Sequence, residues 1–301
     1  DVVLADAREA YATFVLDLQE EIRDLGIDCT RASSREEQVG RCAEFLDQVN
    51  KDIFRTRSDL DFFGRPLGCG PQRDPALVAQ EQARRDSAQC YVDVATPRCH
   101  YDALARVLLV YARLNPVVSY VQGMNEVCAP LYYVFAQDPL CADAEADTFF
   151  CFSALMSHVR DAFVKGMDHT DQGLFGQVEE FSALLRQKDL QLWTHLDSLQ
   201  VAPVYYAVRW LTLLLTQELE LPDVLRLWDA LLSDHRRPHP LIQYVCVVMI
   251  MRARAMLLVG DFSDCLHVLQ QCSPLPLEDT LSVAGRMRWD DLVGDGCSGS
   301  P

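Results

Sequence analysis

Apolar side chains recur with a helical period along most of the chain. Residues 7–25 place Tyr11, Phe14 and Leu18 three or four positions apart, as on one face of an amphipathic helix. The same spacing predicts further helices at residues 38–53, 98–115, 146–165, 174–188, 189–197, 203–218, 222–233, 240–259 and 261–271. Short alternating segments do not recur at regular intervals, so the pattern predicts an all-α fold.

Two stretches depart from this pattern. Residues 63–96 contain repeated Gly and Pro and include the charged segment Glu81–Asp86, which predicts a long loop insertion at the surface. Residues 292–301 show no apolar periodicity and are expected to form a disordered tail. Two apolar runs, residues 204–215 and 241–259, are interrupted by arginine and stay far below the ~20 residues that a bilayer requires. We expect buried helices there and no membrane span.

The composition is that of a folded protein with an acidic surface. Hydrophobic residues make up 50% of the 301 positions and charged residues 24%, which excludes a generally disordered chain. The length allows two globular units or one large one. The net charge is −17, and such a surface repels phosphate backbones and anionic lipid headgroups. Binding to nucleic acid or to membranes through charge is therefore not expected.

Twelve cysteines are spread along the chain without the close C-x2–4-C pairs of structural zinc sites. Cys128, Cys151 and Cys246 lie within apolar stretches, where a free thiol packs like a small hydrophobic side chain. We therefore interpret the cysteines as reduced core residues, and no metal is expected. The first residue is Asp1 and no signal-peptide pattern precedes it, so the sequence is expected to be a fragment, with a removed signal peptide still open.

No self-contained active site is recognisable in the sequence. It lacks a phosphate-binding G-x-x-x-x-G-K-[ST] loop, a zinc-binding H-E-x-x-H helix and a G-x-S-x-G nucleophile elbow. Cys99 with His100, and Cys265 with His267, remain candidate thiol–imidazole pairs, but closeness in sequence does not create a nucleophile and its base. We therefore expect no complete catalytic site in this chain.

Two short polar motifs interrupt apolar surroundings. Gln122, Gly123 and Asn125 break an apolar run after a proline, either to meet another molecule or to satisfy backbone groups where a loop enters a helix. Asp52 and Arg55 are three residues apart near the end of a predicted helix, so they share a face and can pair. Such a pair is usually a solvated surface feature. Neither motif alone establishes a function.

Taken together, the two motifs resemble the signatures of the TBC domain, the module of Rab GTPase-activating proteins. The family motif I-x-x-D-x-x-R-T is matched, with Val in place of Ile, by Val49, Asp52, Arg55 and Thr56. The motif Y-x-Q-G-M-[NS] is matched in full by Tyr120, Gln122, Gly123, Met124 and Asn125. Four fixed letters at about 1/20 each arise by chance only ~0.002 times in a chain of this length, so the joint match is specific.

A third family element, R-x-W-D, is matched by Arg226, Trp228 and Asp229. We interpret it mainly as a core helix with a buried ion pair or cap, direct contact with a partner being the alternative. The family's R-x-x-x-W element near the domain start is absent, which indicates a truncated N-terminal edge. The resemblance implies two helical lobes that form a groove: a TBC domain at residues 1–291, with a finger-bearing N-terminal lobe at about 1–170 and a C-terminal lobe at about 171–291.

The resemblance implies a GTPase activator, not an enzyme with a substrate of its own. The expected partner is a GTP-bound Rab-family GTPase that brings Mg²⁺ and GTP, so no cofactor is expected in this chain. Arg55 would neutralise transition-state charge as an arginine finger, and Gln122 would orient the attacking water in place of the glutamine of the GTPase. Asp52 would hold Arg55 in its working geometry. The other supporting or partner-binding positions are Thr56, Tyr120, Gly123, Met124 and Asn125.

An acidic chain needs a local surface that tolerates phosphate groups, and Arg55, Arg57 and Arg65 are expected to supply it. A Rab partner implies vesicle trafficking, intracellular protein transport, a cytoplasmic location and peripheral recruitment to membranes through partners. Two other classes stay open: a non-catalytic Rab-binding scaffold on the same fold, and a self-contained thiol hydrolase using Cys99 and His100. The sequence does not identify the target Rab, because selectivity lies in diffuse surface contacts.

Overall fold

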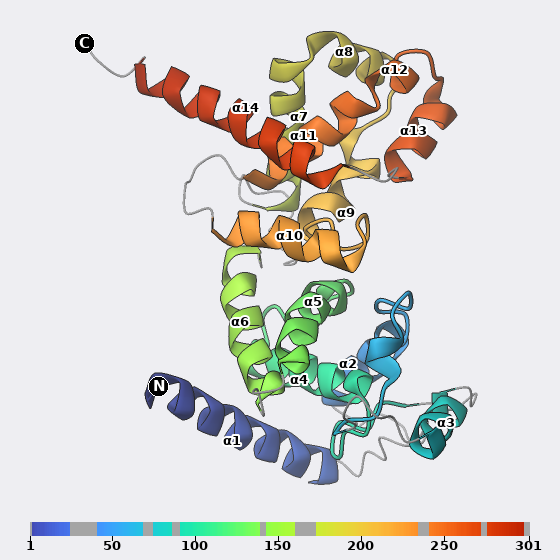
Figure 1. Cartoon of the computed structure of the whole chain (residues 1–301), viewed down its shortest axis with the longest axis vertical. Helices are drawn as coiled ribbons and strands as arrows, with labels where there is room; N and C mark the ends of the chain where they lie inside the picture. Colours follow the sequence, from blue (N-terminus) through green and yellow to red (C-terminus); the bar gives the residue numbers. More distant parts are fainter. Residues whose placement is uncertain are drawn as a thin grey trace. The chain divides into compact units, whose positions relative to one another are not determined.

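A computed structural model describes residues 2–24, 41–68, 75–85, 91–138, 143–159, 173–233, 241–271 and 276–297 (Figure 1). Within these ranges the chain is helical and contains no β-strand, which confirms the all-α prediction. Contacts within the chain divide it into two compact units, unit 1 at residues 1–160 and unit 2 at residues 161–301. The lobe boundary expected near residue 170 lies outside the described residues, and it stays a prediction.

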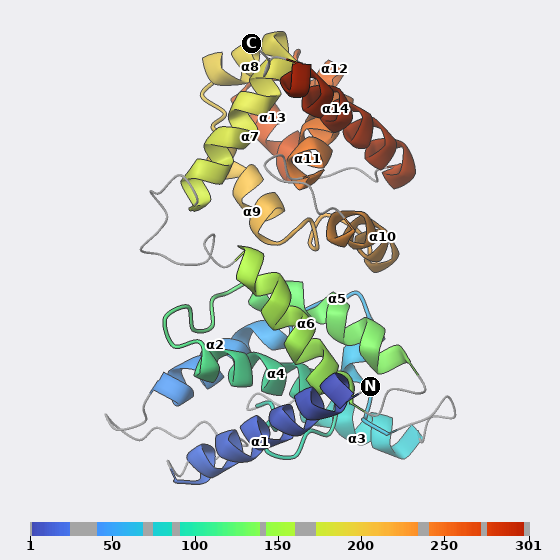
Figure 2. The same cartoon turned by 90° about the vertical axis from the view of Figure 1, so that its left-hand side faces the viewer.

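Unit 1 is organised around its fourth α-helix. Its described helices are α1 (Val2–Asp24), α2 (Arg41–Ile53), the short 3-10 helix η1 (Asp61–Gly64), α3 (Pro75–Arg85), α4 (His100–Leu114), α5 (Met124–Gln137) and α6 (Ala144–Val159). α4 lies among α1, α2, α5 and α6 and contacts all four (Figure 2). Its residues Leu104, Val107 and Leu108 are fully buried. Because α4 is apolar on nearly all sides, it is stable only as an internal helix.

Unit 2 has α11 as its central helix. Its described helices are α7 (Leu174–Lys188), α8 (Leu190–Ser198), the 3-10 helix η3 (Pro203–Tyr205), α9 (Ala207–Thr212), α10 (Leu221–Leu232), α11 (Leu241–Arg252), α12 (Arg254–Leu257), α13 (Phe262–Gln270) and α14 (Leu277–Cys297). α11 packs against α7, α9 and α14, and residues 243–250 are all buried. Among the described helices, none has both the length and the apolarity to cross a membrane.

Most predicted helices are present with shifted ends, but two of them are broken by turns. Residues 203–218 form η3, α9 and a turn, because Leu214 adopts a left-handed φ of 50°. The Leu214 carbonyl accepts a hydrogen bond from Trp228 Nε1 at 3.2 Å, so a tertiary contact overrides local helix propensity. Residues 240–259 divide into α11 and α12 at Ala253, where ψ is 1°.

The prediction of a plain surface loop at residues 63–96 was wrong. This segment contains α3, which begins at Pro75, a residue that is favoured in the first helical turn because its missing N–H costs nothing there. It also contains fully buried apolar residues such as Val92. The parts of the predicted insertion at residues 69–74 and 86–90 lie outside the described residues.

The tail predicted at residues 292–301 is helical as far as Cys297, where α14 ends and the described residues stop. Tertiary contacts explain the longer helix. Asp291 Oδ2 accepts a hydrogen bond from the Tyr244 hydroxyl at 2.8 Å, and Asp291 Oδ1 pairs with Lys188 at 2.5 Å. Both partners come from other helices of unit 2, and they hold the last part of α14 in a helical conformation.

The cysteine prediction was partly right. Cys128 and Cys246 are fully buried free thiols, as expected for core residues. Burial raises the pKa of Cys128, so its thiol stays protonated. Cys151 is a free but exposed thiol on α6, because Phe152 and Met156 occupy the inward positions of that helix.

Candidate functional site

Arg55 lies in the turn that follows the last residue of α2. Its side chain is 68% exposed, whereas that of Asp52 is 6% exposed. Arg55 Nη2 donates to Asp52 Oδ1 at 2.5 Å, and Arg55 Nε donates to the carbonyl of Lys51 at 3.0 Å. The predicted pairing of Asp52 with Arg55 is therefore present. It holds the guanidinium at the surface through two of its five N–H donors.

Gln122 is exposed and lies directly before α5. Gly123, which caps α5, has φ 102° and ψ −20°, a left-handed conformation that a side chain would strain. The Gly123 N–H donates to Asn125 Oδ1 at 3.1 Å, and the Val121 N–H donates to Met124 Sδ at 3.4 Å. The backbone is therefore fixed on both sides of Gln122, and this explains why a glycine follows it.

Buried hydrogen bonds join the two motifs. The Tyr120 hydroxyl lies 3.0 Å from Asp52 Oδ2, and Asn125 Nδ2 donates to Thr56 Oγ1 at 2.8 Å. Thr56 Oγ1 in turn donates to the Asp52 carbonyl at 3.1 Å. All four residues are buried. Segments that are almost seventy residues apart in sequence are thus held together through their side chains.

The single hydroxyl hydrogen of Tyr120 has two acceptors within reach, since Asn125 Oδ1 is 3.1 Å away as well. We assign the hydrogen to Asp52, because an ionised carboxylate accepts a stronger hydrogen bond than a neutral amide does. Asn125 Oδ1 already accepts the Gly123 N–H. Burial, followed by the charge of Asp52, raises the pKa of Tyr120 far above its usual value, so the hydroxyl stays a donor.

The predicted site residues therefore divide into an exposed pair and a buried base. Arg55 and Gln122 are exposed. The buried supporting residues are Asp52, Thr56, Tyr120, Gly123, Met124 and Asn125. Because these side chains are buried, they shape the base of the site and do not form the surface that a partner would touch.

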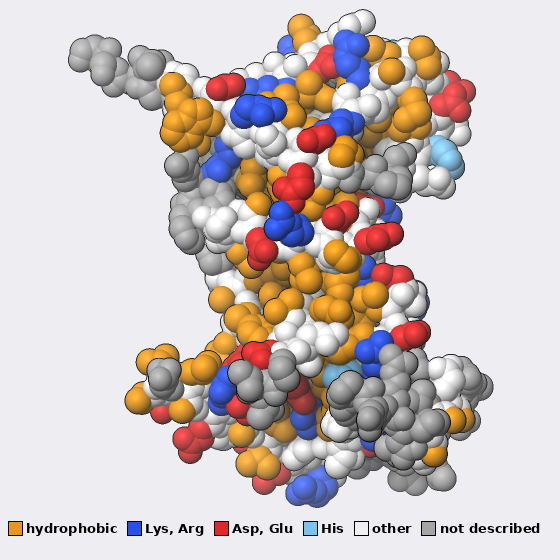
Figure 3. Space-filling view, viewed as in Figure 1, with side chains coloured by type: hydrophobic (Ala, Val, Ile, Leu, Met, Phe, Trp, Pro, Cys, Tyr) orange, Lys and Arg blue, Asp and Glu red, His pale blue; other side chains and the backbone are white. Residues whose placement is uncertain are grey.

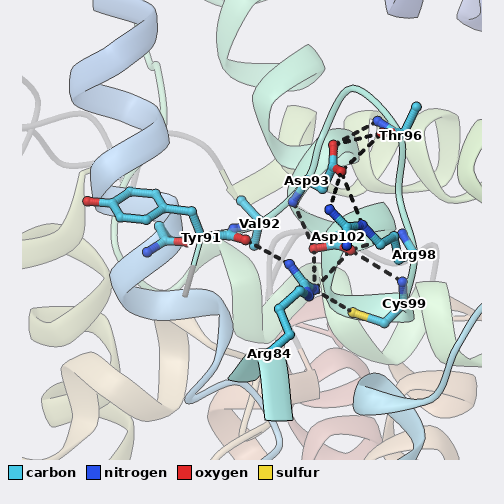
Figure 4. Close-up of polar contacts among 9 residues, drawn as sticks. Arg84, Tyr91, Val92, Asp93, Thr96, Arg98, Cys99 and Asp102 are labelled. Atoms are coloured by element: carbon cyan, nitrogen blue, oxygen red, sulfur yellow. Dashed lines mark hydrogen bonds and ion pairs between the residues drawn. The ribbon is translucent and has the colours of Figure 1, made fainter. Parts of the chain in front are cut away.

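A second polar network lies beside α4 and was not found from the sequence (Figure 4). Asp102 is fully buried and accepts hydrogen bonds from the backbone N–H groups of Asp93 and Arg98, both at 2.9 Å. Arg84 of α3 donates to both Asp102 oxygens at 3.1 Å. A buried carboxylate thus caps α4 and fastens α3 to it. An acidic residue in the first turn of a helix was the available signal.

This network continues to the helix that precedes Arg55. The Val92 N–H donates to Asn50 Oδ1 on α2 at 2.9 Å, while Arg84 Nη1 donates to the carbonyl of Tyr91 at 2.8 Å. The segment expected to be a loop insertion therefore connects α3 and α4 to the last turn of α2.

Arg57 does not add exposed positive charge beside Arg55, contrary to expectation. Its side chain is 6% exposed, and its Nη2 pairs with Asp59 at 2.9 Å. Arg57 also adopts a φ of 45°, which turns the chain sharply after the first motif. Arg65 is half-buried.

The R-x-W-D helix is only partly a core element. Trp228 is buried and its Nε1 donates to the Leu214 carbonyl at 3.2 Å, as the core interpretation requires. Arg226 and Asp229 are exposed, and Arg226 pairs with Glu278 at the surface. The buried ion pair predicted for this element was therefore wrong: the two charged positions lie on the outward face of α10.

The geometry does not support a thiol hydrolase based on Cys99 and His100. Cys99 is fully buried, and its Sγ accepts from Arg84 Nη2 at 3.5 Å. His100 Nδ1 is 2.9 Å from the Tyr132 hydroxyl, and its ring stacks on Phe62 with centroids 4.2 Å apart. The two side chains have different partners, and the thiol has no access to solvent.

Neither a cluster of metal ligands nor, on the face shown in Figure 3, a single basic patch stands out among the described residues. Among them, no three His, Cys, Asp or Glu side chains converge as metal ligands. On the face shown in Figure 3, the blue Lys and Arg side chains are interspersed with red acidic ones instead of forming one basic patch.

The helical fold and the two motifs are those expected for a TBC domain, and the comparison with protein families gives the same result. Residues 80–258 match the profile of the Rab-GTPase-TBC domain, so this chain belongs to that family. The match includes the Gln122 motif but begins after Arg55.

Relatives extend the likeness over most of the chain. Human TBC1 domain family member 13 is 34% identical over 334 residues, covering 93% of this chain and 82% of its own length. The mouse protein of the same name is 37% identical over 276 residues, covering 80% of this chain and 68% of its own. The crystal structure of the Ypt/Rab-GAP domain of Gyp1p aligns with a TM-score of 0.65 at 22% identity, covering 94% of this chain and 82% of that one. This last likeness shows the fold.

Proposed function

We propose that this chain accelerates GTP hydrolysis by a Rab-family GTPase, with Arg55 and Gln122 acting in trans. The observation that carries the proposal is the buried bonding between Asp52 and Tyr120. This hydrogen bond holds the buried residues of the two motifs together, while Arg55 and Gln122 remain exposed on the same unit. A satisfied buried network of this kind pre-organises the side chains that it supports.

Arg55 neutralises the negative charge that develops on the phosphate oxygens in the transition state. Arginine suits this role because its planar guanidinium is always charged and can contact two oxygens at once. The hydrogen bonds to Asp52 and to the Lys51 carbonyl occupy two of its donors and restrict its motion. The entropy cost of ordering the side chain is thus largely met before the partner binds.

Gln122 orients the water that attacks the γ-phosphate. A carboxamide has both a donor and an acceptor, so it can hold a water and a backbone group at the same time. Gly123 supports this role, because its left-handed backbone, which a glycine adopts without strain, leads from Gln122 into α5. GTP and Mg²⁺ would be carried by the partner GTPase, and the metal ion would help to neutralise the phosphate charge there.

The proposal is tested by single-turnover GTP hydrolysis across a panel of Rab proteins. We expect Arg55→Ala to reduce the acceleration about 1,000-fold and Gln122→Ala about 100-fold. Two exposed residues serve as matched controls, Arg23→Ala on α1 and Gln187→Ala on α7, and neither should change the rate. Full acceleration by Arg55→Ala would contradict the proposal.

The same panel of Rab proteins distinguishes a GTPase activator from a protein that only binds Rab proteins. Binding to GTP-loaded Rab proteins without any acceleration would indicate a non-catalytic scaffold on the same fold. A cytoplasmic location, with peripheral recruitment to membranes through partners, stays a prediction that follows from the Rab partner. So does a role in vesicle trafficking.

A further inference from the structure

Arg65 is a half-buried guanidinium without a carboxylate partner. It follows η1 directly, and its Nε is buried without a hydrogen-bond partner. Among the described residues, no acidic side chain forms an ion pair with it. A charge that loses part of its hydration without gaining a partner costs free energy.

This situation contrasts with the other arginines of unit 1 that are at least half-buried. Each of those forms an ion pair with a carboxylate: Arg8 with Asp147, Arg57 with Asp59, Arg84 with Asp102, Arg106 with Glu145 and Arg113 with Glu21. The chain has 44 acidic residues against 27 basic ones, so carboxylates are not scarce. Among the described residues, Arg65 nevertheless has no carboxylate beside it, so a partner protein can supply one.

The surroundings of Arg65 leave its positive charge uncompensated. The charge of Arg65 acts on His100, whose ring stacks on Phe62 and bonds to Tyr132. Burial first, and the charge of Arg65 second, lower the pKa of His100 to about 4. The ring is thus neutral at physiological pH and neither offsets nor adds to the charge of Arg65.

Arg65 belongs to the same local structure as Arg55. The Tyr101 ring packs against Phe54 with centroids 5.5 Å apart and against Phe63 with centroids 5.7 Å apart. Phe54 precedes Arg55 directly, and Phe63 is two residues before Arg65. A standard interface covers about 800 Å² on each partner, or roughly 30 Å across. An interface centred on Arg55 is therefore broad enough to include Arg65 as well.

We propose that Arg65 binds an acidic side chain on the surface of the partner GTPase. This inference rests on the proposed function. A carboxylate fits the planar fork of arginine and restores the charge balance that this chain leaves open. Arg65 thus contributes to the affinity for the GTPase and to the choice among GTPases. A GTPase without a carboxylate at that place would leave the guanidinium unpaired.

The test measures single-turnover hydrolysis by a responsive Rab as a function of the concentration of this chain. Arg65→Ala is expected to raise the half-saturating concentration about 10-fold with the same maximal rate, and to weaken its dependence on salt. Arg65→Lys should recover part of the affinity. Arg23→Ala, which removes an exposed arginine on α1, is the matched control. Thermal unfolding should not be impaired, since Arg65→Ala breaks no ion pair within the described residues and removes a charge that is costly to bury.

Three outcomes would contradict the proposed role of Arg65. An unchanged half-saturating concentration for Arg65→Ala, with wild-type stimulation that still depends on Arg55, overturns the role of Arg65 and leaves the proposed function intact. A lower maximal rate at an unchanged half-saturating concentration assigns Arg65 to the nucleotide phosphates and overturns the carboxylate. Failure of the wild-type chain to bind or stimulate any Rab overturns both proposals.

Discussion

The Tyr120 hydroxyl donates to Asp52 Oδ2 at 3.0 Å, although 68 residues separate the two in sequence. The other oxygen of the same carboxylate holds Arg55 at 2.5 Å. One buried carboxylate therefore couples the turn that carries Arg55 to the turn that carries Gln122. Together with the bond from Asn125 to Thr56, this carboxylate sets the relative position of the two exposed side chains.

The first prediction removes the coupling without changing the shape of the ring. Tyr120→Phe should lower the free energy of unfolding by about 1–2 kcal/mol, because Asp52 loses a buried donor. The acceleration of GTP hydrolysis should fall about 10-fold, since the two turns are then held together less tightly, through the remaining bond from Asn125 to Thr56. Chemical denaturation and single-turnover hydrolysis measure the two effects. Tyr133→Phe, which removes the hydroxyl of a half-buried tyrosine on α5, is the control and should change neither quantity. An effect on stability without any effect on hydrolysis would show that the coupling has no catalytic role.

The second prediction concerns the backbone beside Gln122. Gly123→Ala should destabilise the protein by about 1–2 kcal/mol, because alanine disfavours a φ of 102°. Gly285→Ala is a matched change in the middle of α14, where no atom lies within 4 Å of the added methyl group. It should be neutral or stabilising by up to about 1 kcal/mol. Equal effects of the two substitutions on the thermal unfolding temperature would contradict the strain at Gly123.

The residues around Arg55 and Gln122 carry local signals, but only the family resemblance singled these two out as the candidate site. Arg55 follows a helix whose apolar period is clear, and Gln122 precedes a glycine that only a turn requires. Both features are local in sequence. The contact between Asp52 and Tyr120 is not, since no periodicity relates positions 68 apart. It could be expected only through the family resemblance.

The segment around α3 shows why the network of Arg84 and Asp102 was not predicted. Gly and Pro at residues 63–96 indicate a loop. The structure of that segment, however, depends on the hydrogen bonds from Arg84 to the buried carboxylate of Asp102 on α4. The helix predicted from residue 98 begins in fact at His100, which places Asp102 at the third helical position, where it caps the helix. A boundary error of two residues was enough to hide the capping role of Asp102.

The third prediction compares a buried ion pair with an exposed one. Arg84→Gln should destabilise the protein by about 3 kcal/mol, because it leaves the fully buried Asp102 carboxylate without its cation. Arg226→Gln breaks the exposed pair with Glu278 and should have no measurable effect. Urea denaturation of both variants measures the difference. Similar midpoints for the two would show that α3 is not fastened by this ion pair.

The last prediction is a pH dependence that originates at His100. Burial and the neighbouring charge of Arg65 lower the pKa of His100 from 6.5 to about 4. As pH falls below 6.5, the unfolded chain takes up a proton that the folded protein does not, so the free energy of unfolding decreases until about pH 4. A shift of this size corresponds to about 3 kcal/mol.

The comparison of wild type with His100→Gln isolates this contribution, because the other titrating groups are common to both proteins. The stability advantage of the wild type should be largest at pH 7 and should shrink by about 3 kcal/mol on acidification to pH 4. His267→Gln, which removes an exposed histidine on α13, is the matched control. Parallel stability curves for wild type and His100→Gln between pH 7 and pH 4 would mean that the ring is protonated in the folded protein. The charge beside Arg65 would then be higher than the structure implies, and a carboxylate of the partner would face two cations instead of one.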